Sequence, residues 1–183
     1  AHELEEIASN YFGIGLSTQR FDELTRDTEM LLKSKEAFSA SIVSASTTVK
    51  ERAHRFFAAL PSEGGFGAPT AGRMPFEDRE GFLEESGDTY TATLNALTRL
   101  EGELERVKNV EEIPGLRKRT ADIRAHLAFL LESTDRNTVF WIERRAAGGV
   151  RNLARGGAAP AAFHTHLQAT PIDVSEQLTT SLF

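Results

Sequence analysis

The apolar spacing of residues 36–60 constrains the fold of this chain more than any other feature of its sequence. Apolar side chains recur there at intervals of four or three residues, as Phe38, Ile42, Ala45, Val49, Ala53, Phe56 and Leu60. Such intervals place side chains along one face of a helix that packs against other helices. Pro61 ends the helix because proline has no backbone N–H to donate. The spacing therefore predicts a long helix that needs partner helices to bury its seam.

Further segments carry similar helical stripes. A short helix is predicted over residues 1–12, and another follows a cap at Ser17 or Thr18. A fourth helix is expected to begin at its cap Asp88, and a fifth to occupy residues 116–131. The apolar stripe of the helix capped at Ser17 or Thr18 is Phe21, Leu24, Thr28 and Leu31. The stripe of the fourth helix is Tyr90, Leu94, Leu97, Leu100, Leu104 and Val107, and that of the fifth is Leu116, Ile123, Leu127, Leu130 and Leu131. Amphipathic helices joined by short or moderate loops bury such stripes most simply as an antiparallel bundle.

Two segments near the end alternate in the manner of strands. Residues 138–145 are rich in β-branched and aromatic side chains, which suit a pleated, half-buried surface. In residues 163–168, apolar or threonine side chains alternate with histidine and glutamine, the period of a strand with two different faces. Pro171 is expected to stop this strand. A closing helix should follow, with Val174, Leu178 and Leu182 on one apolar stripe.

The predicted fold class is mainly α: an antiparallel helical bundle with a small two-strand β element and a closing C-terminal helix. Ile42, Phe56, Leu97 and Leu127 are expected to be buried between its helices. Residues 61–76 hold four glycines and three prolines and are expected to form a loop.

The composition fits a soluble, cytoplasmic protein. The chain has 183 residues, no cysteine, and no apolar run approaching the ~20 residues that span a bilayer. It opens inside a predicted helix without a methionine, so we expect it to be part of a longer protein. No nucleophile elbow, zinc-ligand helix motif or complete phosphate-binding loop is present. The residues alone therefore name no reaction.

Charge is distributed unevenly along the chain, whose net charge is −6. Residues 1–105 have 10 basic and 19 acidic side chains (net −9), whereas residues 106–155 have 11 and 6 (net +5). Residues 156–183 have 2 acidic side chains and no basic one (net −2). A basic segment on an acidic body is what a locally bound polyanion requires, although a solvated helix face gives the same count.

The candidate DNA-binding residues lie in this basic segment. They are Arg117, Lys118, Arg119 and Arg124, and, near the strands, Arg144, Arg145, Arg151 and Arg155. Residues 117–119 occupy the first turns of a helix, where positive charge opposes the helix dipole. That placement needs a compensating partner, either an anion such as DNA phosphate or the neighbouring Glu111 and Glu112.

Two histidines and one tryptophan of the predicted strands are further candidates for binding. His164 and His166 project from one strand face and can both reach one metal ion, but no third ligand is identifiable, so no metal site is predicted. Trp141 in its strand is expected to be core rather than a platform for stacking bases.

Both ends of the chain resemble one protein family. Residues 1–8, Ala-His-Glu-Leu-Glu-Glu-Ile-Ala, look like the last two letters of a DEAH box and the helix after it, and residues 16–24 resemble the next segment of DinG/XPD-type superfamily 2 DNA helicases. Residues 138–145 and 167–174, followed by Leu178 and Leu182-Phe183, are similar to the segment by which DinG and YoaA proteins re-enter the helicase motor. The matches occur in the correct order.

The resemblance implies a helicase fragment. Residues 1–26 would be the end of the DEAH motif and the following motor segment, residues 27–135 the Arch-like helical insertion, and residues 136–183 the return to the motor. In this family the Arch domain helps to enclose the translocating single strand, so the implied partners are single-stranded DNA and the rest of the motor, with no membrane.

The resemblance also assigns the chemistry. His2 corresponds to the motif II residue that links ATP hydrolysis to DNA engagement. ATP and Mg²⁺ are handled upstream, where family members often have an iron–sulfur cluster, so no cofactor is expected in this fragment. The competing interpretation is a non-enzymatic helical bundle that binds another protein through an exposed seam.

Overall fold

The computed structural model describes residues 13–34, 40–63, 71–146 and 163–172. The described helices are α2 (Thr18–Ser34), α3 (Ala40–Ala59), α4 (Arg79–Glu105) and α5 (Ile113–Glu132). The strands are β1 (Ile14–Ser17), β2 (Gly72–Pro75), β3 (Thr138–Ala146) and β4 (Phe163–Pro171). The mainly α class is therefore confirmed, with two more strands than the sequence predicts. The helices predicted over residues 1–12 and after Pro171 lie outside the described residues.

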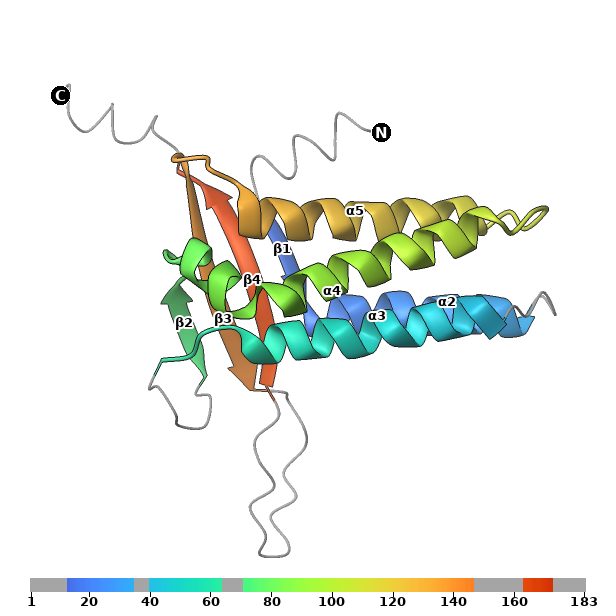
Figure 1. Ribbon diagram of the computed structural model, residues 1–183, viewed down its shortest axis with the longest axis horizontal. Coiled ribbons are helices and arrows are strands. Elements are labelled where there is room, and N and C mark those ends of the chain that lie inside the picture. The colour runs from blue at the N-terminus through green and yellow to red at the C-terminus, as the bar shows by residue number, and fades with distance from the viewer. Residues whose placement is uncertain (1–12, 35–39, 64–70, 147–162, 173–183) are drawn as a thin grey trace, which may run out of the picture.

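The four helices form an antiparallel bundle that projects from one side of the sheet (Figure 1). Each helix packs against the next one along the chain. The four residues chosen as core from sequence are buried: Ile42 is 1% exposed, and Phe56, Leu97 and Leu127 are 0% exposed. The predicted seams are thus the faces that meet inside the bundle.

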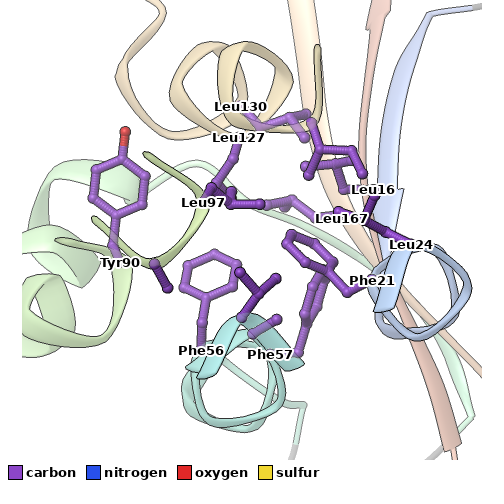
Figure 2. Packing of buried hydrophobic residues seen from close by; sticks show 14 of the residues in the cluster. Leu16, Phe21, Leu24, Phe56, Phe57, Tyr90, Leu97, Leu127, Leu130 and Leu167 are labelled. Carbon is purple, nitrogen blue, oxygen red and sulfur yellow. The ribbon is translucent and has the colours of Figure 1, made fainter. Parts of the chain in front are cut away.

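The core continues from the bundle into the sheet. Figure 2 shows Leu16 of β1 and Leu167 of β4 packed with Leu24 and Phe21 of α2 and with leucines of α4 and α5. Phe21 and Phe57 meet edge to face, with ring centroids 5.9 Å apart, which is the favourable geometry for an aromatic pair. α2 also runs through the predicted domain boundary between residues 26 and 27.

The sheet has the order β1-β4-β3-β2, and all its pairs are antiparallel. β1 adds to the outer edge of β4, with Leu16 opposite Leu167. β2 adds to the outer edge of β3, with Pro75 opposite Trp141. β2 lies inside the segment that was expected to be a loop, and a proline is tolerated there because β2 is an edge strand. The first and last described strands are consequently neighbours.

Only one face of the sheet packs against the bundle. Phe140, Ile142 and Leu167 point toward the helices and are buried. The alternate residues form what we call the open face: Arg73 and Pro75 of β2; Val139, Trp141, Glu143 and Arg145 of β3; and His164, His166, Gln168 and Thr170 of β4. Within the described ranges no helix or strand covers this face (Figure 1). The prediction that Trp141 is core is wrong, because the strand alternation places it on the open face.

The N-cap of α4 lies ten residues before the predicted cap Asp88. Asp78 is the N-cap, and its Oδ1 accepts a hydrogen bond from the backbone N–H of Gly81 at 2.9 Å. The helix kinks at Ser86, whose φ of −128° and ψ of 17° are not helical. Asp88 lies just beyond the kink and accepts a hydrogen bond from Thr89 N–H at 2.9 Å. The two aspartates therefore mark the two parts of one kinked helix.

None of the helices that the structure describes is both long enough and apolar enough to cross a lipid bilayer.

Candidate nucleic-acid interface

The basic residues at the start of α5 are each paired with a carboxylate. Arg117 Nη1 lies 3.4 Å from Glu105 Oε1, and Lys118 Nζ lies 2.8 Å from Asp122 Oδ2. Arg119 Nη1 donates to an oxygen of Asp27 at 2.7 Å. These contacts supply the compensating negative charge that cations in the first turns of a helix require.

Arg124 follows the same pattern, because its Nη2 donates to Glu101 Oε2 at 2.9 Å. Glu101 and Glu105 belong to α4, and Asp27 belongs to α2, so three of these acids come from the acidic part of the sequence. The positive excess counted along residues 106–155 is thus largely offset by acids that folding brings alongside. A count along the sequence cannot detect this neutralisation.

Arg144 is a buried cation at the junction between the sheet and the bundle. It is 8% exposed, and its Nη2 donates to the backbone carbonyl of Leu60 at 3.1 Å, immediately after α3 ends. Burial lowers the pKa of its guanidinium. A cation at the C-terminal end of a helix satisfies a carbonyl that has no partner within the helix and complements the helix dipole. The Arg144 side chain therefore joins β3 to α3.

Arg145, the next residue, points to the opposite face and is exposed. Its Nε and Nη2 donate to the two carboxylate oxygens of Glu143 at 3.0 and 3.1 Å. Arg73 of β2 lies 3.8 Å from the same carboxylate. The Arg145 hydrogen bonds hold the pKa of Glu143 below its usual range. Two guanidinium groups thus share one carboxylate, which leaves this part of the open face with a net positive charge.

Trp141 lies beside this charged cluster. The Cζ of Arg73 is 4.8 Å from the centroid of its ring, a cation–π distance. A shallow groove of about 420 Å³ runs past the ring, lined by apolar side chains that include Val139, Pro171 and Ile172. Val139 is 45% exposed and Ile172 is 38% exposed. Sequence reasoning missed Arg73 because it lies in a segment rich in glycine and proline.

The two histidines also belong to the open face. His166 lies opposite Glu143, and His164 lies opposite Arg145. Burial, followed by repulsion from Arg145, lowers the pKa of His166. Across the residues that the structure describes, no cluster of three histidine, cysteine, aspartate or glutamate side chains able to hold a metal ion occurs.

The structure separates the two groups of candidate DNA-binding residues. α5 begins at the end of the bundle remote from the sheet, so residues 117–119 lie far from the open face (Figure 1). His2, Arg151 and Arg155 fall outside the described residues. Among the predicted DNA-binding residues that are described, Arg145 alone belongs to the open face.

The chain matches no protein-family model, no curated protein sequence and no solved structure. The resemblance to DinG/XPD-type helicases therefore rests on the sequence motifs at the two ends.

Proposed function

We propose that this chain is a fragment of a DinG/XPD-type ATP-dependent DNA helicase that contains its Arch-like helical insertion and the motor segments on either side. It helps to enclose and guide single-stranded DNA during unwinding in DNA repair or replication. The parent enzyme hydrolyses ATP with Mg²⁺ in the bacterial cytoplasm, near the nucleoid. The groups that handle ATP and Mg²⁺ lie upstream, and His2 is what this chain retains of motif II. The chain itself has no ATPase activity, because it contains no phosphate-binding loop.

The pairing of β1 with β4 is the observation that carries this proposal. Ile14 lies opposite Ala169, so the described chain enters and leaves the fold on neighbouring strands. All the residues of the helical bundle come between these two strands in the sequence. An insertion that moves as one body relative to a motor needs this arrangement, since its entry and exit must lie close together.

A strand-guiding role is supported by the chemistry of the open face. Binding of a single strand without sequence preference combines positive charge, which follows the phosphates, with aromatic rings on which bases stack. Arg73 and Arg145 share one carboxylate, and Trp141 lies next to Arg73. Arg117 and Arg124 of α5 are weaker candidates, because each is paired with a carboxylate that it does not share with another arginine.

A second candidate is a helical module that binds another protein without catalysis. The exposed Val139 and Ile172 beside the groove favour it, since neighbouring exposed apolar side chains often mark a protein interface. The helicase interpretation accounts for the charges on the same face, whereas an apolar protein contact leaves them without a role.

Fluorescence anisotropy separates the two candidates. A labelled thymidine oligonucleotide is titrated with the 183-residue chain at several salt concentrations. We expect weak binding whose affinity falls steadily as salt rises, because bound counterions are released from the phosphates. An oligonucleotide of mixed sequence should bind with similar affinity. Absence of binding at low salt, or an affinity that salt leaves unchanged, would refute the proposal.

A further inference from the structure

The position of Trp141 on the open face leads to a more specific inference, which rests on the proposed function. The groove beside the indole ring is apolar at Val139, Pro171 and Ile172 and basic at Arg73. Pro75, opposite Trp141 on β2, completes the wall on that side. A flat aromatic ring in an apolar recess next to a cation provides what a nucleotide needs: a stacking surface for the base and a positive charge for the phosphate.

The other arginine extends this site along the strand. Trp141 and Arg145 are four residues apart on β3 and point to the same face, a separation of roughly 13 Å at the usual rise of a strand. Arg73 and Arg145 both contact the carboxylate of Glu143, which lies between Trp141 and Arg145 on the same strand. One carboxylate cannot neutralise two guanidinium groups, so the attraction for an anion remains. The contacts form a line from an aromatic end to a basic end, which suits an elongated polyanion.

Arg73 is placed to change partners when a strand binds. Its side chain is 60% exposed, and within the described ranges it contacts the ring of Trp141 and lies 3.8 Å from the carboxylate of Glu143. Glu143 keeps its two shorter hydrogen bonds from Arg145 if Arg73 leaves. The indole Nε1 of Trp141 is buried and has no hydrogen-bond acceptor among the described residues. Movement of Arg73 toward a phosphate would uncover the ring and give this donor access to an acceptor on the DNA.

We propose that the open face is a base-stacking subsite for single-stranded DNA, in which Trp141 stacks on a base while Arg73 and Arg145 bind flanking phosphates. A protein partner would have to bury the same two guanidinium groups against one carboxylate, which is costly without further acids. A polyanion supplies the missing negative charge itself.

The intrinsic fluorescence of the unmodified chain tests this site directly, because Trp141 is its only tryptophan. We expect a thymidine oligonucleotide to quench the emission in proportion to the occupancy measured by anisotropy. An abasic oligonucleotide of equal length has the same charge but no bases, so it should bind more weakly and leave the emission nearly unchanged.

Variants of Trp141 provide the second measurement. W141L should weaken binding by about tenfold, as expected for loss of one stacked base, while W141F should retain part of the affinity. If the oligonucleotide binds but the emission does not change and W141L binds like the parent, the subsite is refuted and the proposed function stands. If no single strand binds at low salt, both are refuted. The quenching requires no variant, so misfolding of W141L cannot hide the result.

Discussion

Replacing Arg144 with glutamine should destabilise the fold, although the residue is a candidate for DNA binding from sequence. Its buried guanidinium donates to the carbonyl of Leu60 at 3.1 Å, and the shorter glutamine side chain does not extend that far. A hydrogen bond from a charged donor contributes about 1.5–3 kcal/mol. Burial lowers the pKa of Arg144, so the folded state carries a desolvation cost that neutral glutamine avoids. We therefore expect the R144Q substitution to lower the free energy of unfolding by about 1.5 kcal/mol, the lower end of that range.

Urea unfolding, followed by the emission of Trp141, measures this loss. The matched control is R145Q, one residue along β3, where the side chain is exposed on the opposite face. We expect R144Q to unfold at lower urea with an unchanged slope, and R145Q to keep the parental midpoint. An unchanged midpoint for R144Q, or an equal loss in R145Q, would refute the assignment of Arg144 to the junction between β3 and α3.

Other outcomes can be checked separately. L97A and L127A should each lower the free energy of unfolding by about 2–5 kcal/mol in urea titrations, because both side chains are 0% exposed; losses near zero at both sites would contradict the bundle. The pKa of His166 is lowered on folding, so the folded state binds fewer protons and stability should fall as pH drops below about 6.5. In unfolding titrations at several pH values, H166Q should lose less stability at low pH than the parent. An unchanged pH profile in H166Q would argue against the role of His166 in this loss. Phosphate-release assays should detect no ATPase activity of the chain alone, and turnover that persists through stringent purification would overturn that expectation.

The helices were predictable because their signals are local and repeated. The seam from Ile42 to Phe56 and the leucines at 97 and 127 recur at helical intervals, and burial follows wherever such faces can meet. The start of α4 was misplaced because Asp78 and Asp88 both resemble caps. Asp78 is the N-cap in the structure, whereas Asp88 lies inside the helix just after the kink at Ser86 and accepts a hydrogen bond from the N–H of the adjacent Thr89.

The short strands and the charge pairing depend on contacts between distant residues. β1 and β2 have four residues each, and both contain glycine, so they exist as strands only because β4 and β3 provide partners. Arg119 and Asp27 are separated by most of the bundle in sequence and meet only after α2 and α5 are placed. Residues 138–145 were predicted as a strand from their β-branched and aromatic content, which does not tell which of its two faces the helices cover.

We propose that the open face, rather than the basic start of α5, holds the single strand. The most direct test of this proposal compares the salt dependence of affinity for two double variants, R73Q/R145Q and R117Q/R119Q, with that of the parent. Each phosphate contact on a single strand contributes about 0.7 to the slope of log affinity against log salt, so two contacts contribute about 1.4. We predict that R73Q/R145Q flattens the slope by up to this amount while R117Q/R119Q keeps the parental slope. A flattened slope in R117Q/R119Q together with a parental slope in R73Q/R145Q would contradict the claim.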